Sequence, residues 1–144
     1  MNLLYFIALL GILLFIACAT EPSGAPQAGL VGKWACVSAV VDGKPLPDDT
    51  VRLLRLSLTS DRYKTEKGAE VLFDSTYSVD RSKTPKEINM IGTEGALAGK
   101  EAQGIYALDG DTLHICYTMP GERRPTAFES AAGSKAFLVQ WKRL

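Results

Sequence analysis

The sequence predicts an all-β protein that folds as a single antiparallel barrel of about eight or nine strands. Apolar and polar residues alternate with a period of two, as in residues 53–59 and 111–118. This alternation places one face of each strand in a core and the other in water. Turn-forming pairs such as Asp42-Gly43 punctuate the segments at short intervals. Such strands form a barrel or a sandwich, and closure into a barrel removes exposed strand edges.

The alternation and the turns set the expected elements. We expect strands over residues 31–41, 53–59, 62–66, 70–80, 86–92, 102–108, 111–118, 125–130 and 135–143. Pro47-Asp48-Asp49 predicts one helical turn over the next residues, because aspartate oxygens accept hydrogen bonds from free N–H groups at a helix start. Asp109-Gly110 is the strongest hairpin signal, since a type I′ turn needs positive φ at both central positions. Gly104, early in its strand, indicates a bend or a bulge.

Bulky side chains are expected to fill the barrel. An eight-stranded barrel has an interior only just wide enough for side chains or for one small ligand. A filled interior would favour contacts through loops, whereas a cavity would favour a small ligand. The side chains expected to point inward are Trp34, Cys36, Leu54, Leu56, Leu58, Phe73, Tyr77, Ile88, Met90, Ile105, Ile115, Tyr117, Phe137, Val139 and Trp141.

The N-terminus predicts export. Leu3 to Ala19 is an uncharged, almost wholly apolar run that ends in small residues, as secretory signals do. Ala17-Cys18 resembles a bacterial lipobox, which implies a signal peptide over residues 1–17 and a lipid on Cys18. Two alternatives remain open: cleavage at an A-x-A site that removes Cys18, or an uncleaved anchor. The expected location is the periplasm, or the membrane of a bacterial cell envelope through the lipid anchor.

Residues 18–29 are expected to form a flexible tether, because residues 21–29 are rich in Pro, Gly, Ala and Ser and lack hydrophobic periodicity. The ordered domain then spans residues 30–144, which is long enough to bury a core without disulfides or metals. The 16 basic and 16 acidic residues are scattered through the chain. No basic stripe indicates nucleic acid as a partner. We expect a monomer.

A family resemblance agrees with these expectations. Gly32 and Trp34 stand as in the lipocalin G-x-W motif, and the last strand ends in a cation, Arg143, where lipocalins place one against that tryptophan. More closely, residues 30–143 resemble a planctomycete-type lipocalin-like domain of uncharacterised function. The matching segments are residues 40–47, 104–113, 115–117 and 120–128. The resemblance implies the fold, an exported setting and structural roles for Gly32, Trp34 and Arg143, but no known chemistry.

The sequence contains no recognisable set of catalytic or metal-binding residues, so we expect no enzyme, no cofactor and no metal. His114 is the only histidine, and no nucleophile motif accompanies it. His114 and Cys116 share a strand face, but strand residues two apart lie roughly 6.5–7 Å from each other. The domain cysteines lack metal-ligand spacing. A Cys36–Cys116 disulfide is disfavoured, because the first and penultimate strands of a meander are second neighbours.

Two classes of function remain. The first is a non-catalytic binding module whose mouth takes a small apolar molecule. The second is a protein-interaction or protease-inhibitor barrel that acts on another protein of the cell envelope. Residues 93–103 form the loop most suited to a functional role, because small residues and glycines leave it mobile at one barrel end. Residues 119–125 are the rival, because they present charge on a turn.

Overall fold

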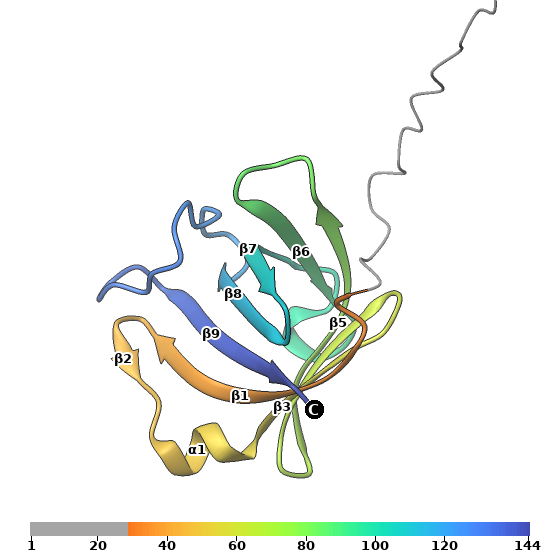
Figure 1. Ribbon diagram of the computed structural model, residues 1–144. Coiled ribbons are helices and arrows are strands. Elements are labelled where there is room, and N and C mark those ends of the chain that lie inside the picture. Colours follow the sequence, from red (N-terminus) through yellow and green to blue (C-terminus); the bar gives the residue numbers. More distant parts are fainter. Residues whose placement is uncertain (1–28) are drawn as a thin grey trace, which may run out of the picture.

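A computed structural model describes residues 29–144 and shows a closed antiparallel β-barrel (Figure 1). β1 pairs with both β3 and β9, so the eight main strands of the described chain form a cylinder without a free edge. These strands are β1 (Gly32–Val41), β3 (Leu54–Leu58), β4 (Arg62–Lys67), β5 (Glu70–Asp80), β6 (Lys86–Gly92), β7 (Glu101–Asp109), β8 (Thr112–Thr118) and β9 (Ala136–Arg143). The predicted all-β barrel is therefore confirmed. The predicted signal peptide over residues 1–17, the predicted lipidation site Cys18 and the predicted tether up to residue 28 lie outside the described residues.

Three short elements complete the described chain. β2 (Lys44–Pro45) pairs only with the end of β1, α1 (Asp48–Leu53) follows it, and the 3₁₀-helix η1 (Gly95–Leu97) lies between β6 and β7. The predicted helical turn is present, but no aspartate side chain caps it, because Pro47 occupies the N-cap position. Asp48 and Asp49 lie in the first turn instead, where their negative charges interact favourably with the positive end of the helix dipole. Among the described residues, no helix combines the length and apolar composition needed to cross a bilayer.

One predicted strand is wrong. Residues 125–130 form no strand and belong to the long loop over residues 119–135 between β8 and β9. β8 pairs directly with β9 from Thr112↔Lys142 to Thr118↔Ala136, so no ladder position is left for another strand between them. Pro125 also lacks the N–H group that a central strand needs.

The turns differ from the expectation in one respect. Asp42 and Gly43 both have positive φ, at 49° and 79°, as a type I′ hairpin turn requires. In the β7–β8 hairpin Asp109 pairs with Thr112, so Gly110 and Asp111 are the central residues. Of these two, only Gly110 has positive φ, at 56°, which fits a type II′ turn. The type I′ geometry expected at Asp109-Gly110 is therefore wrong.

Gly104 forms no bulge and no register break, so the bulge that the sequence suggested is absent from the described strand. It pairs regularly with Ile88 on β6 and Tyr117 on β8. A Cβ atom at this position would lie 2.7 Å from the Cys116 carbonyl oxygen and 2.8 Å from the Tyr117 Cβ. The glycine is required by the close approach of its neighbours. The register break on β1 lies elsewhere, between Cys36 and Ser38.

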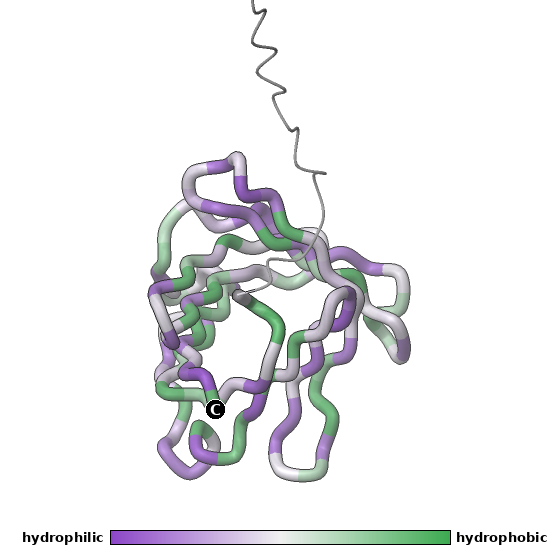
Figure 2. Tube along the Cα trace, turned by 45° about the vertical axis from the view of Figure 1, so that its right-hand side comes forward, coloured by the Kyte–Doolittle hydropathy of each residue, from purple (hydrophilic) through white to green (hydrophobic). Residues whose placement is uncertain are grey.

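Apolar and polar residues alternate along the strands, as the alternating colours in Figure 2 show, and the apolar sets meet inside the barrel. Of the predicted inward residues, only Ile105 is placed wrongly. It packs on the outer face of the barrel with Cys116 and Ala136 in a second, smaller cluster, against which Phe128 of the long loop lies. Its inward-facing neighbour is Tyr106, which is 1% exposed. Ile105 is thus buried by the loop and not by the barrel interior.

Arg124 attaches this loop to the barrel wall. Its Nη1 donates to the carbonyl oxygen of Gly104 at 2.6 Å and to that of Ile88 at 3.2 Å. Its Nη2 donates to Asn89 Oδ1 at 2.6 Å, and its Nε lies 3.7 Å from Glu87 Oε1. Charge-assisted hydrogen bonds of this kind are roughly twice as strong as neutral ones. One guanidinium therefore joins the loop to β6 and β7.

Candidate functional site: an apolar cavity at the open end of the barrel

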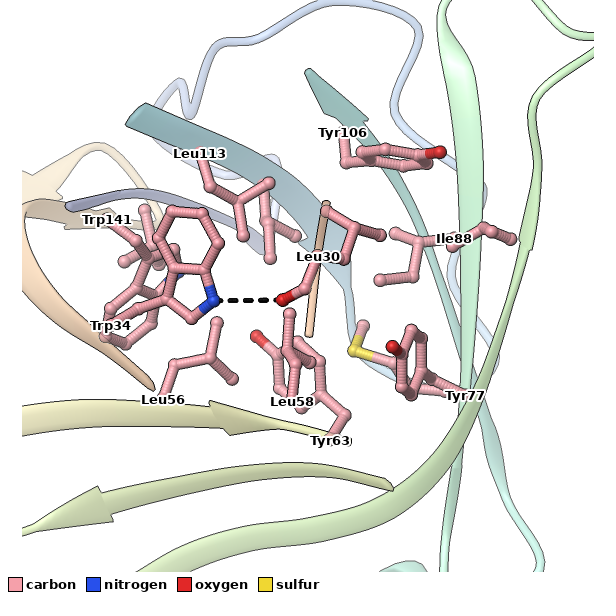
Figure 3. Packing of buried hydrophobic residues seen from close by; sticks show 14 of the residues in the cluster. Leu30, Trp34, Leu56, Leu58, Tyr63, Tyr77, Ile88, Tyr106, Leu113 and Trp141 are labelled. Atoms are coloured by element: carbon pink, nitrogen blue, oxygen red, sulfur yellow. Dashed lines mark hydrogen bonds between the residues drawn. The ribbon is translucent and has the colours of Figure 1, made fainter. Parts of the chain in front are cut away.

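The two ends of the barrel differ, and the end at which β1 begins is closed by packed side chains. Trp34 is fully buried there, and its Nε1 donates to the carbonyl oxygen of Leu30 at 3.1 Å. Figure 3 shows the Leu30 side chain in the middle of a ring of apolar and aromatic residues from several strands. Leu30 is 1% exposed and fills this end of the barrel. It was not among the residues predicted to point inward.

The structure brings the three motif residues Gly32, Trp34 and Arg143 together at this closed end. The Arg143 guanidinium carbon lies 4.2 Å from the centre of a Trp34 ring. The same guanidinium donates to the carbonyl oxygens of Val31, at 3.2 Å, and Gly29. Gly32 has a φ of 145°, and a Cβ atom there would lie 3.1 Å from Arg143 Nη1. Glycine is needed at position 32 both for its backbone angle and for the space it leaves.

The opposite end of the barrel contains a cavity of about 300 Å³. Most of the strand residues in its lining lie near the end of their strand that is away from Trp34, and α1 and η1 add one residue each. Trp141, which pairs with Cys36 on β1, extends the lining deeper into the barrel. The lining residues are Ala39, Val41, Leu46, Thr50, Leu54, Thr65, Leu72, Phe73, Leu97, Ala102, Tyr117, Met119, Pro120, Phe137, Val139 and Trp141. The size is at the lower end of the range for ligand pockets, and the mainly apolar lining is typical of them.

Both loops that the sequence singled out contribute to this cavity. Leu97 comes from η1 in the first of these loops, which covers residues 93–100 and is shorter than predicted because β7 begins at Glu101. Met119 and Pro120 come from the start of the loop over residues 119–135. The same two loops therefore form part of the entrance. Leu72 also lines the cavity while remaining 48% exposed, so the apolar lining continues onto the outer surface at the rim.

Aromatic rings stiffen one wall of the cavity. The rings of Tyr117 and Phe137, on the neighbouring strands β8 and β9, stack with centroids 4.9 Å apart and an interplanar angle of 10°. Burial raises the pKa of the Tyr117 hydroxyl well above its usual value of 10. Burial likewise raises the pKa of the Cys36 thiol to about 11, although a hydrogen bond to the Ser38 carbonyl and the charge of Arg55 oppose the shift. Both groups are therefore uncharged at neutral pH.

The His114 ring and the Cys116 thiol each contact another group. The His114 ring makes an edge contact with Phe128, with centroids 6.5 Å apart. The Cys116 Sγ donates to the Glu129 carbonyl oxygen at 3.4 Å, and burial raises the pKa of this thiol. Within residues 29–144, no three His, Cys, Asp or Glu side chains are grouped so that they could hold a metal ion.

Cys36 and Cys116 are both free thiols. β9 separates their strands, and the two side chains lie on different faces of the wall: Cys36 packs against the interior core, and Cys116 belongs to the outer cluster. The expectation that they do not pair is confirmed by this arrangement. Cys116 faces outward as predicted, but the long loop covers it completely.

No family model, curated protein or solved structure matches this chain.

The sequence reasoning missed two residues that shape the cavity and the core. Ala102 lines the cavity, and Tyr63 is almost completely buried in the interior. Tyr63 lies between Arg62 and Lys64, so the period-two alternation would have identified it. Ala102 carries no such signal, because a small apolar residue fits either face of a strand.

Proposed function

We propose that this protein is a non-catalytic binding module that takes a small, mainly apolar molecule into the cavity at the open end of its barrel. The cavity is the observation that supports this function most directly, because the closed half of the same barrel is filled by side chains. Burial of apolar ligand surface in such a lining provides roughly 25 cal/mol per Å². Ligands of this class include small lipids and isoprenoid-like or aromatic molecules.

The position of the first described residue is consistent with a membrane tether. Gly29, the first described residue, lies at the closed end, where its carbonyl oxygen accepts a hydrogen bond from Arg143. The cavity opens at the other end, so a tether from Cys18 would leave its entrance free. We propose that Cys18 is lipidated and anchors the chain to a membrane of the cell envelope. Intact-mass analysis of the membrane fraction tests this, and an unmodified chain that begins at Thr20 would contradict it.

Native mass spectrometry of the protein purified from its own cells tests ligand binding. We expect an adduct of lipid-like mass on the wild-type protein. Ala102→Leu places a larger side chain in the cavity and should abolish the adduct. Ala107→Leu is the matched control, because it makes the same change on the same strand but outside the cavity. Ala107 lies between the inward-facing Tyr106 and Leu108, so its side chain is on the outer face of the barrel. Equal adduct levels on both variants would show that the molecule binds elsewhere.

A second candidate is an interaction or inhibitor barrel that contacts an envelope protein through the rim. Leu53, Val71 and Leu72 support it, because each is 45–49% exposed at the end of the barrel where the cavity opens. Exposed apolar side chains grouped in this way mark interaction sites. A stoichiometric protein partner in a pull-down from the cell envelope, lost on Leu72→Ser but retained in Ala102→Leu, would favour this candidate.

A further inference from the structure

The described residues that line the cavity include no Asp, Glu, Lys, Arg or His. Transfer of a charged group from water into an apolar environment is strongly unfavourable unless a partner of opposite charge receives it. A carboxylate or an ammonium group inside this cavity would find no such partner. The lining therefore selects against charged ligands.

Three of the lining residues carry a hydroxyl group. They are Thr50 on α1, Thr65 on β4 and Tyr117 on β8. Within the described chain, none of the three side chains forms a hydrogen bond with another residue. β4 and β8 are separated by three strands in either direction around the barrel, so Thr65 and Tyr117 belong to opposite walls. A molecule in the cavity can reach hydroxyl groups on both sides.

Tyr117 is the best placed of the three. Stacking on Phe137 fixes its ring, so little side-chain entropy is lost when its hydroxyl forms a hydrogen bond. Burial keeps the hydroxyl protonated at neutral pH, so it can both donate and accept. A polar group that lacks a partner in the protein favours a ligand that supplies one.

We infer that the cavity takes an uncharged ligand with at least one oxygen atom, such as an alcohol, a ketone or an ester, and that the Tyr117 hydroxyl forms a hydrogen bond with this oxygen. The inference rests on the proposed function and deepens it. It excludes fatty-acid anions and cationic amphiphiles as preferred ligands. It also makes Tyr117 the residue that distinguishes an oxygen-bearing ligand from a plain hydrocarbon.

Three aromatic probes of nearly equal size test the inference: naphthalene, 2-naphthol and 2-naphthoate. Their binding to the purified full-length chain is measured by isothermal titration calorimetry at pH 7, where the naphthol is neutral and the naphthoate is ionised. We expect 2-naphthol to bind about fivefold more tightly than naphthalene and at least about tenfold more tightly than 2-naphthoate. Tyr117→Phe keeps the ring and should remove only the advantage of 2-naphthol over naphthalene.

Tyr106→Phe is the matched control, because its hydroxyl is also buried without a partner but does not line the cavity. It should leave all three affinities unchanged. If 2-naphthoate binds as tightly as 2-naphthol, the ligand class is wrong while the binding function stands. If Tyr117→Phe weakens naphthalene and 2-naphthol equally, Tyr117 acts through packing and its assigned hydrogen bond is wrong. If no probe binds, both the proposed function and this inference are overturned.

Discussion

Trp34 on the first strand of the barrel and Arg143 on the last lie face to face, with the guanidinium carbon 4.2 Å from the ring centre. β1 and β9 are also hydrogen-bonded neighbours, with Trp34 paired to Arg143 in their register. The contact therefore forms where the two ends of the described chain meet and the barrel closes. Asp111 forms an ion pair with the same guanidinium, with its Oδ1 3.3 Å from Nε.

Trp34→Ala should lower the free energy of unfolding by about 3–5 kcal/mol, which is usual for a buried aromatic side chain truncated to alanine. The change removes a fully buried indole and leaves the Arg143 guanidinium without its ring contact. Urea unfolding followed by circular dichroism measures the effect. Trp34→Phe is the control: it retains most of the buried area but loses the hydrogen bond to Leu30, so the loss should be smaller. An unchanged urea midpoint in Trp34→Ala would contradict a role for this residue in closing the barrel.

Gly32→Ala should destabilise the domain by about 1–3 kcal/mol. The new Cβ atom would meet Arg143 Nη1 at 3.1 Å, and the φ of 145° is unfavourable for alanine. Gly95→Ala is a control for backbone strain alone, because Gly95 has a φ of 67° and nothing lies within 4 Å of a Cβ atom there. Thermal unfolding of both variants compares the loss of stability at position 32 with the loss from backbone strain alone at position 95. Equal shifts in Tm would show that the contact with Arg143 adds nothing at position 32.

The strand order and most of the interior could be predicted from the sequence, because a half-buried antiparallel strand imprints its period of two on its own residues. The alternation pattern failed where segments distant in the sequence decide which side chains are buried and which residues form a strand. Ile105 and Tyr106 are both apolar, so alternation alone does not say which of them points inward. The long loop over residues 119–135 buries the one that points outward. The false strand over residues 125–130 arose likewise, since the direct pairing of β8 with β9, which excludes it, is not visible in the local pattern.

The cavity has no local signature at all. Its volume is the difference between the space enclosed by eight strands and the sum of the inward side chains, and both depend on the closed barrel. Small residues such as Ala39 and Ala102 create part of the space, yet each resembles an ordinary strand residue in the sequence. The closed end was easier to predict, because Gly32, Trp34 and Arg143 form a recognisable set.

The stability of the folded chain should fall as the pH rises above 9. The pKa of the Cys36 thiol is raised from 9.0 to about 11, chiefly because burial disfavours the thiolate. The folded chain therefore holds this proton more tightly than the unfolded chain, so the contribution is fully present below pH 9 and is lost as the pH approaches 11. We expect a loss of about 1 kcal/mol, reduced by solvent screening because the thiol is only half-buried.

Urea unfolding under reducing conditions at pH 7, 9 and 10 measures this loss. Cys36→Ser is the matched variant, because serine does not ionise in this range, and its free energy of unfolding should depend less on pH. Burial raises the pKa of Tyr77 from 10.0 to about 12, so its ionisation affects the free energy of unfolding only above pH 10. Between pH 9 and 10 the change in stability therefore comes from the thiols. If the free energy of unfolding depends on pH equally in the wild type and in Cys36→Ser, the Cys36 thiol does not cause the loss of stability.

Arg124→Ala should detach the long loop from the outside of the barrel and lower the free energy of unfolding by about 2 kcal/mol. Removal of the guanidinium leaves the carbonyl oxygen of Gly104 without a hydrogen bond of 2.6 Å, and the loss of charge-assisted bonds typically costs about 1.5–3 kcal/mol. Arg123→Ala is the matched control, because Arg123 is the adjacent arginine and its side chain is exposed. The backbone carbonyl oxygen of Arg123 that accepts from Thr118 is unaffected by this substitution.

Alkylation of Cys116 under native conditions reports directly on the loop in these variants. The thiol is fully buried beneath the loop and donates to the carbonyl oxygen of Glu129, so iodoacetamide should modify it slowly in the wild type and in Arg123→Ala. In Arg124→Ala the modification should become several-fold faster, while far-UV circular dichroism keeps the signal of the intact barrel. Arg124→Lys should give an intermediate rate, because an ammonium group cannot reproduce the planar fork that contacts β6 and β7 together. If both Arg124 substitutions leave the Cys116 rate unchanged, Arg124 does not hold the loop, and the apolar cluster around Phe128 and Ile105 is sufficient by itself.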